Sequence, residues 1–403
     1  LAVIVGITYF LYRDGPPHPE APGAVEYCVL AAVFGMGPIV VNTLTSRTIF
    51  GLRERAREAM QLGQYTLLEK LGAGGMGVVY KARHATLRRP TAIKLLPVER
   101  AGAQNLTRFE REVQLTSQLT HPNTVAIYDY GRSADGILYY AMEFLDGLDL
   151  DSIVRISGPL PAARVVHVLT QVALALAEAH ESELLHRDIK PQNVILCRRG
   201  GVNDFAKVVD FGLVKDLQSA SDASMSAINT IIGTPLYMSP EAIARPNTVD
   251  PRSDLYALGA VGYFLLTGTP PFRGDSVVEI CSQHLHAPVE PPSQRVEGID
   301  AALEALLLTC LAKKRDQRPS SASELATRLQ DLGLPSWKRA DADGWWREHA
   351  DAVSSVKRER SAAAAERAST VPIATVAIDP RERGSAMPLA WQSSPAIPDP
   401  TGE

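Results

Sequence analysis

The stretch LLHRDIKPQNVIL, residues 184–196, is the part of the sequence that decides the fold. Between two apolar runs it gathers ionisable and amide side chains, namely His186, Arg187, Asp188, Lys190 and Asn193. Burying such groups is costly unless they are paired or used. The stretch therefore predicts a functional site rather than a surface loop.

The residue types in this stretch suit phosphoryl transfer. The carboxylate of Asp188 is placed to accept a proton from an attacking hydroxyl, and Lys190 can neutralise the charge of a migrating phosphoryl group. Asn193 offers a neutral amide oxygen to a metal, and Asp210 in VVDFGL adds a second oxygen ligand. With water and phosphate completing the shell, this ligand set favours Mg²⁺ over zinc.

A glycine-rich segment, LGAGGMGVV at residues 71–79, predicts a phosphate-binding loop. Its glycines, Gly72, Gly74 and Gly77, form a GxGxxG pattern in which backbone N–H groups can approach phosphate oxygens closely. Taken alone, the pattern suits a hairpin without a ligand equally well. It lies between two predicted strands and not before a helix, which argues against a dinucleotide-binding fold.

Lys94 and Glu112 extend this site. Lys94 lies in the strand-like segment AIK, and Glu112 lies on the helix predicted next, where it offers an ion-pair partner. Each residue alone would be an ordinary surface charge. With the glycine-rich segment, they predict a lysine that is aimed at phosphate groups.

Composition limits the class of protein. The chain has 403 residues, of which 45% are hydrophobic, so it can form two or three domains with real cores. A net charge of −4 gives no reason to expect nucleic acid as a partner. The four cysteines lie far apart, which indicates core residues in a reducing compartment and not a metal site.

The first 64 residues predict a membrane region. We expect the sequence to begin within a partial helix at 1–12, followed by an outside loop at 13–23 and a transmembrane helix at 24–46. A signal peptide or a buried core helix is the alternative. Arginines cluster directly after residue 46, so by the positive-inside tendency the remainder is cytoplasmic at the inner membrane. Residues 47–64 are predicted to form a juxtamembrane helix.

From residue 65 to residue 332 the pattern is globular. Strand-like runs dominate up to Asp149 and helical runs follow, which predicts a small sheet-rich lobe and a larger helical lobe. Residues 333–403 are rich in Ala, Ser and Pro, and we expect them to be mostly disordered. The tryptophans before the Ala-rich run, Trp337, Trp345 and Trp346, predict a terminal turn packed on the domain.

Five motifs occur along the chain in a set order and spacing: the glycine-rich loop, AIK, HRDIKPQN, DFG and SPE. On these motifs, residues 65–332 resemble bacterial eukaryotic-like protein serine/threonine kinases. The resemblance implies an α+β, two-lobed protein kinase fold, here preceded by a transmembrane helix. It also implies ATP-dependent transfer of the γ-phosphoryl group to Ser and Thr hydroxyls of protein substrates, with autophosphorylation, in membrane-linked signalling. The implied cofactors are ATP and Mg²⁺, with Mn²⁺ as a substitute.

The resemblance assigns roles residue by residue. It implies that Asp188 is the catalytic base, that Lys94 pairs with Glu112, and that Asn193 and Asp210 hold Mg²⁺. Met142 is the expected gatekeeper, with the backbone of Glu143 and Leu145 contacting adenine. The implied nucleotide-binding set is Leu71, Gly72, Ala73, Gly74, Gly75, Met76, Gly77, Val78, Val79, Ala92, Lys94, Glu112, Met142, Glu143, Leu145 and Ile195.

The resemblance covers further positions, of which Lys190 belongs to the expected catalytic set and Thr234 to the expected regulatory set. Lys190 and Thr234 fit the Ser/Thr-specific pattern. Glu241 is expected to pair with Arg318, and Asp254 to brace the catalytic loop. Two departures from the family pattern, Ser239 in the SPE motif and Tyr256 in place of Trp, lie away from the phosphate site.

Regulation is expected on the activation loop. By the resemblance, Arg187 is paired by a phosphate there, and the candidate acceptors are Ser224, Ser226 and Thr230. A constitutively active loop is the alternative. In the tail, Thr370 and Thr375 each precede an isoleucine by three residues, a spacing that resembles sites of phosphothreonine-reading domains. A solvated tail without a partner is the alternative there.

Two other classes of protein fit part of the pattern. A pseudokinase scaffold usually lacks Lys94, Asp188 or Asp210, whereas this chain has all three. A small-molecule kinase of the aminoglycoside type would lack the lysine of HRDIKP and the segment GTPLYMSPE. Phosphorylation of a general protein acceptor with ATP and Mg²⁺ separates the three classes.

Overall fold

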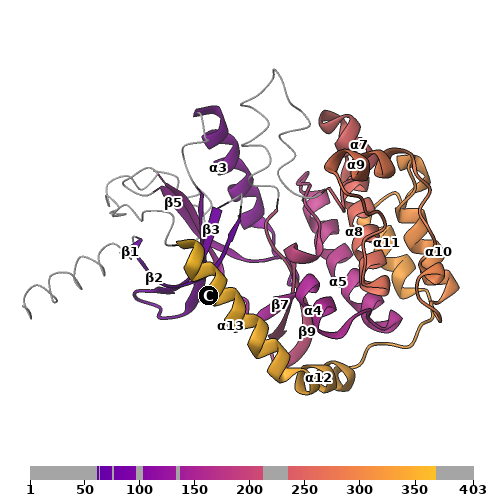
Figure 1. Cartoon of the computed structure of the whole chain (residues 1–403). Helices are drawn as coiled ribbons and strands as arrows, with labels where there is room; N and C mark the ends of the chain where they lie inside the picture. Colours follow the sequence, from indigo (N-terminus) through magenta and orange to yellow (C-terminus); the bar gives the residue numbers. More distant parts are fainter. Residues whose placement is uncertain are drawn as a thin grey trace, which may run out of the picture. The chain divides into compact units, whose positions relative to one another are not determined.

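The computed structural model describes residues 61–62, 64–74, 77–96, 103–132, 137–211 and 235–368. Within them a sheet-rich lobe precedes a helical lobe (Figure 1), so the predicted α+β architecture is confirmed. The helices predicted at 1–12 and 24–46 lie outside the described residues.

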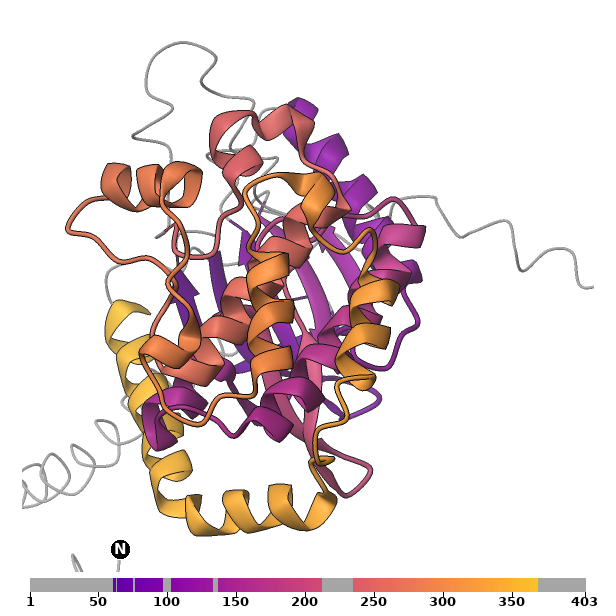
Figure 2. The same cartoon turned by 90° about the vertical axis from the view of Figure 1, so that its right-hand side faces the viewer.

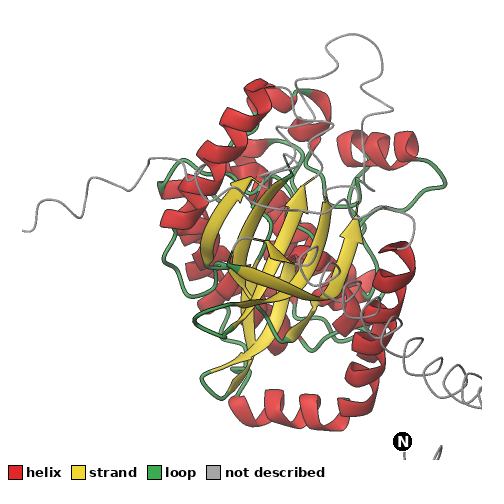
Figure 3. Cartoon of the chain, turned by 90° about the vertical axis from the view of Figure 1, so that its left-hand side faces the viewer, coloured by secondary structure: helices red, strands yellow, loops and turns green. Residues whose placement is uncertain are grey.

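The N-terminal lobe is an antiparallel sheet with one helix. Its strands follow the order β1-β2-β3-β4-β6-β5 (Figure 3). They are β1 (Gln61–Leu62), β2 (Tyr65–Gly74), β3 (Gly77–His84), β4 (Pro90–Leu96), β5 (Ile127–Arg132) and β6 (Leu138–Glu143), and helix α3 (Ala103–Gln118) follows β4. Alternation in β4 buries Ala92 and Lys94 on one face and Ile93 on the other, which supplies a side-chain cluster on each face of the sheet.

The prediction of a helix over residues 47–64 is wrong at its C-terminal end. Gln61 and Leu62 form strand β1, which pairs at the edge of the sheet beside β2. Leu62 is 1% exposed and packs with Tyr65 and Leu67, so burial of this leucine in the sheet outweighs the helical pattern. The remainder of that prediction lies outside the described residues.

The C-terminal lobe combines a small sheet with a helical core. The three-stranded sheet is β7 (Gly147–Asp149), β8 (Val194–Arg199) and β9 (Val202–Val208). The α-helices are α4 (Leu150–Ser157), α5 (Ala162–Glu181), α7 (Pro240–Ala244), α8 (Pro251–Thr267), α9 (Val277–His286), α10 (Ala301–Cys310) and α11 (Ala322–Gln330). Short 3-10 turns are η2 (Pro191–Asn193), η3 (Pro246–Thr248), η4 (Pro292–Gln294) and η5 (Arg315–Gln317).

Helix α5 lies at the centre of this lobe. Within the described residues it is the one helix long and apolar enough to cross a membrane, but half of its apolar window is buried inside the protein. Val165, Val168 and Val172 are fully buried against α8 and α11. Its apolar composition therefore serves the core of the lobe.

Helix α8 has a capping residue at each end and two glycines that contact α10. Asp250 caps its N-terminus and Gly268 ends it in the left-handed region at φ 71°. A Cβ at Gly259 would lie 2.6 Å from Cys310 Cβ, and one at Gly262 would lie 2.7 Å from Leu307. Both glycines thus allow α8 to pack closely on α10.

The prediction that residues 333–403 are mostly disordered is wrong for residues 339–368. Helices α12 (Arg339–Glu348) and α13 (Ala350–Ala368) continue the chain past the C-terminal lobe (Figure 2). The indole N–H groups of Trp337 and Trp346 donate to the buried carboxylate of Asp204, at 2.8 and 2.7 Å. These bonds, to a residue far away in sequence, hold α12 on the C-terminal lobe, although its sequence shows no sustained hydrophobic periodicity.

Candidate active site

The catalytic loop holds the carboxylate of Asp188 between two side chains. Lys190 Nζ lies 2.6 Å from Asp188 Oδ2, and Asn193 Nδ2 lies 3.0 Å from the same oxygen. Asn193 Nδ2 also donates to the backbone carbonyl of Asp188 at 2.8 Å. The residues predicted to be catalytic are therefore brought together, and Asp188 is restrained from two sides.

Asp254 on α8 braces the backbone of this loop, as predicted. Its Oδ2 accepts the N–H of His186 and its Oδ1 accepts the N–H of Arg187, both at 2.9 Å. Arg187 has a φ of 60°, an unfavourable conformation for a residue with a Cβ. Burial would raise the pKa of Asp254, but bonds from His180 and His186 lower it below its usual range, so the brace is anionic.

His186 fixes the loop to the strand that leads to Asp210. The ring is fully buried; its Nδ1 accepts the N–H of Asp188 at 3.2 Å, which leaves Nε2 to donate to the carbonyl of Val209 at 3.0 Å. Burial lowers the pKa of His186, which keeps the imidazole neutral. The ring also packs on Phe211, with centroids 4.7 Å apart.

Lys94 and Asp210 form an ion pair across the site, with Nζ 2.8 Å from Oδ1. The hydroxyl of Tyr140 donates to the same carboxylate oxygen at 2.8 Å. Burial would raise the pKa of Asp210, but Lys94 and Tyr140 lower it below its ordinary value. Glu112 lies partly buried on α3, and its predicted pairing with Lys94 stays a prediction.

Asn193 and Asp210 fit a magnesium site. The N–H of Val209 donates to the carbonyl of Asn193 at 3.0 Å, which links the two segments that carry the ligands. Asn193 donates to Asp188 through its amide nitrogen, and its amide oxygen is the atom suited to a hard cation. No cluster of three His, Cys, Asp or Glu side chains that could hold a metal exists among the described residues.

The side chains predicted to enclose the purine form one apolar cluster. Ala92 and Met142 are buried, at 5% and 7% exposure, and partly buried neighbours from both lobes pack around them. The predicted members of that cluster are Leu71, Val79, Ala92, Met142, Leu145 and Ile195. The residues predicted to contact the purine are thus brought together from both lobes.

Glu143 has a structural side chain that the sequence did not reveal. Its carboxylate pairs with Lys207 and Arg199 and accepts the N–H of Ala126 at 2.9 Å. Its own N–H donates to the carbonyl of Ala126, also at 2.9 Å. The backbone group that Glu143 can offer to adenine is therefore its carbonyl.

The glycine-rich turn joins β2 and β3. Val78 pairs with Ala73, and Gly77 pairs with Gly74, while Gly75 and Met76 lie outside the described residues. Gly77 has a φ of 126°, and a Cβ there would lie 2.2 Å from the carbonyl oxygen of Leu95. Only glycine fits that position, whereas a Cβ at Gly72 would meet nothing within 4 Å.

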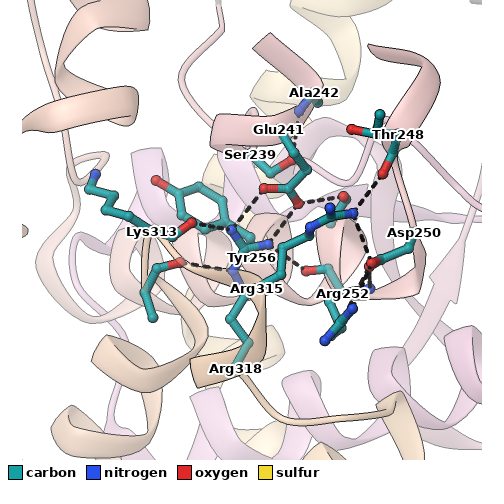
Figure 4. Close-up of polar contacts among 12 residues, drawn as sticks. Ser239, Glu241, Ala242, Thr248, Asp250, Arg252, Tyr256, Lys313, Arg315 and Arg318 are labelled. Carbon is teal, nitrogen blue, oxygen red and sulfur yellow. Dashed lines mark hydrogen bonds and ion pairs between the residues drawn. The ribbon is translucent and has the colours of Figure 1, made fainter. Parts of the chain in front are cut away.

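The predicted Glu241–Arg318 bridge is confirmed (Figure 4). Arg318 binds the carboxylate with both terminal nitrogens, at 2.7 and 2.9 Å. Ser239, a departure from the family pattern, caps α7 by accepting the N–H of Ala242 at 3.3 Å. Tyr256 is the other departure, and its ring centroid lies 4.9 Å from Cζ of the Arg318 guanidinium. Thr234 and the acceptors Ser224, Ser226 and Thr230 lie outside the described residues.

Comparison with known proteins gives a consistent result. The model of the family "Protein kinase domain" matches residues 65–329. The chain is 39% identical over 271 residues to the serine/threonine-protein kinase pkn3 of Myxococcus xanthus, covering 66% of this chain and 49% of that protein. It is 40% identical over 270 residues to PknB of Mycobacterium tuberculosis, covering 66% and 42%. The chain thus spans less than half the length of these relatives.

Solved structures agree with the fold. The crystal structure of the M. tuberculosis PknI kinase domain superposes with a TM-score of 0.54 at 29% identity, over 68% of this chain and 99% of that one.

Proposed function

Because this chain belongs to the protein kinase domain family, we propose that it is an ATP-dependent serine/threonine kinase that phosphorylates protein substrates. The observation that supports this most directly is the restrained Asp188 carboxylate. Lys190 and Asn193 hold it from two sides, and Asp254 fixes the backbone of its loop. Asp188 accepts the proton of a substrate hydroxyl, and Lys190 stabilises charge on the migrating phosphoryl group.

The remaining residues position ATP. Lys94 orients the phosphates and the apolar cluster around Ala92 and Met142 holds the purine. Mg²⁺, when bound, neutralises phosphate charge, and Asn193 and Asp210 would hold it. A fixed, partly buried arrangement of this kind catalyses by positioning and electrostatics.

The test is incubation of the chain with radiolabelled ATP, Mg²⁺ and a general protein acceptor, followed by phosphoamino-acid analysis. Labelled phosphoserine or phosphothreonine is expected. Label on a small-molecule alcohol but not on protein would favour the small-molecule class, and nucleotide binding without transfer would favour a pseudokinase.

Membrane-linked signalling is a further part of the proposal. The apolar run at residues 24–46 and the arginines after it support an inner-membrane anchor with the kinase domain in the cytoplasm. Carbonate washing should not release the protein from membranes, whereas a form that starts a few residues before β1 should remain in solution and active. Complete release of the long form would favour an interfacial helix.

The tail is proposed to recruit a phosphothreonine-reading domain after autophosphorylation. The support is the spacing of Thr370 and Thr375 from the isoleucines that follow them. Mass spectrometry of autophosphorylated protein should find phosphate on at least one of them. Two unmodified threonines would remove this proposal.

A further inference from the structure

Helix α13 runs from the C-terminal lobe to the sheet of the N-terminal lobe (Figure 1). At its start, Val353 is 8% exposed and packs in the core of the C-terminal lobe, joined by Val356. Preceding it, α12 is held by the two indoles that donate to Asp204. The base of α13 is therefore rigidly attached to one lobe.

Three side chains of α13 then contact the region where the lobes meet. Lys357 Nζ lies 2.5 Å from Asp146 Oδ1, and the guanidinium of Arg360 pairs with Asp149. The hydroxyl of Ser361 donates to the carboxylate of Glu69. Residues 357–361 of one helix thus bind the segment at residues 146–149 and strand β2 of the N-terminal lobe.

The partners of α13 border the nucleotide site. Asp146 and Asp149 follow the predicted adenine contact Leu145, and Asp149 pairs in register with Ile195 of the purine cluster. Glu69 lies on β2, two residues before Leu71 at the start of the glycine-rich segment.

Of the three contacts, the Arg360–Asp149 pair has the most buried carboxylate. Asp149 is 4% exposed, and its Oδ1 caps α4 by accepting the N–H of Ser152 at 2.8 Å. Its other oxygen receives Arg360, so the arginine compensates a buried charge. Lys357 and Asp146 are more exposed, and a pair of that kind is weak on its own.

We propose that α13 is an inter-lobe strap that limits opening of the cleft between the lobes and thereby slows the entry and release of nucleotide. Opening the cleft moves β2 away from the segment at residues 146–149. Since α13 is fixed at its base and bonded to both, that motion must break the contacts at Arg360 or Ser361. The slower entry and release of nucleotide rests on the proposed function, whereas the limit on cleft opening does not.

The experiment uses the full chain and two independent measurements. Stopped-flow binding of a fluorescent ADP analogue gives the association and dissociation rate constants, and hydrogen exchange reports on β2 without any ligand. In Lys357→Ala/Arg360→Ala, both rate constants should rise at least fivefold while Kd changes less than threefold. Exchange in residues 65–74 should accelerate at least tenfold.

Matched variants separate the strap from general effects. Arg358→Ala removes an arginine of the same helix whose guanidinium donates to the backbone carbonyl of Ser354, at 3.4 Å, and should behave as wild type. Arg360→Lys should restore most of the wild-type behaviour. Glu69→Ala leaves Asp149 and its cap intact, and should raise the exchange rate of β2 at least twofold even if the double variant fails to fold.

Two results decide the outcome. Exchange of β2 within twofold of wild type in Glu69→Ala would overturn the strap, and so would rate constants within twofold of wild type in a folded double variant. Faster β2 exchange in a protein that binds no nucleotide would support the strap and contradict the proposed function.

Discussion

Arg164 and Asp204 form an ion pair from which water is excluded, with both side chains 0% exposed. Arg164 Nε lies 2.8 Å from Asp204 Oδ2, and Nη2 lies 2.9 Å from Oδ1. The two indole N–H groups from residues 337 and 346 complete the shell of the carboxylate. The guanidinium lies 4.2 Å from the ring centroid of Trp345. One buried charge pair thus joins α5, β9 and the C-terminal segment.

Replacing Asp204 by Asn should strongly destabilise the protein, because it leaves the buried guanidinium of Arg164 without a counter-charge. We expect a loss of about 3–5 kcal/mol in the free energy of unfolding, measured with urea. Trp346→Phe removes one bond to a charged group and should cost about 1.5–3 kcal/mol. Arg155→Ala, which breaks an exposed pair with Asp151, is the control and should change stability by under about 0.5 kcal/mol. An Asp204→Asn variant as stable as that control would contradict this account.

Lys94→Met and Asp188→Asn should each abolish phosphoryl transfer while the domain stays folded. Neither side chain is needed to complete the hydrophobic core, and both act on the phosphates or the nucleophile. For Asp188→Asn we expect a fall in kcat of several orders of magnitude, with an unchanged circular dichroism spectrum. Retention of more than about a tenth of the wild-type turnover, a loss under about 1.4 kcal/mol, would refute the assignment.

Asp254→Asn should reduce kcat at least tenfold and leave the nucleotide Kd within threefold. An amide has one oxygen for the two backbone N–H groups of His186 and Arg187, so its NH₂ group would face a donor and shift the loop. Steady-state kinetics and nucleotide titration measure the two effects separately. Tyr256→Phe, which removes a buried hydroxyl bonded to His284 at 2.8 Å, is the control and should retain turnover. Equal losses in both variants would show that Asp254 acts only through stability.

Glu241 should contribute stability that is lost in acid. Burial would raise its pKa, but Arg318 and Ser253 outweigh burial and lower it from 4.5 to about 2. A group with a depressed pKa stabilises the fold fully above its unfolded pKa, and that stability is lost as pH falls from about 4.5 toward 2. The shift corresponds to about 3 kcal/mol. The free energy of unfolding in urea should therefore fall more between pH 6 and pH 3 in the wild type than in Glu241→Gln. An equal fall in the two proteins would exclude this role.

Combined replacement of Ser224, Ser226 and Thr230 by alanine should greatly reduce substrate phosphorylation. A phosphate on this loop carries nearly two negative charges and can bind the guanidinium of Arg187, next to the catalytic Asp188. Phosphatase treatment of the wild type should lower activity in the same way. If the triple variant matches untreated wild type, the loop is constitutively active and the switch does not exist.

The sequence predicts the catalytic loop well because its chemistry is local. Asp188, Lys190 and Asn193 lie within six positions of one another, so a short motif defines their geometry. The role of Asp254, 66 positions later, follows only from the family resemblance. Tyr140 was missed, although it lies opposite Lys94 in the strand register and therefore on the same face of the sheet.

Helices α12 and α13 were missed for a physical reason. The Ala-rich composition of α13 gives no amphipathic stripe, and its order depends on contacts with residues far away in sequence. Trp337 binds Asp204, which lies 133 positions earlier, and Ser361 binds Glu69, 292 positions earlier. Local patterns cannot report such contacts, whereas the three tryptophans were a usable sign that the segment packs on the domain.

The return path of α13 has a mechanical consequence. The described domain begins at β1, beside β2, and its last helix comes back to β2 as well. The first strand and the last helix of the described residues therefore both contact β2. Because α13 is also fixed at its base to the C-terminal lobe, a pull on its far end would load the Ser361–Glu69 and Arg360–Asp149 contacts that join it to the two lobes.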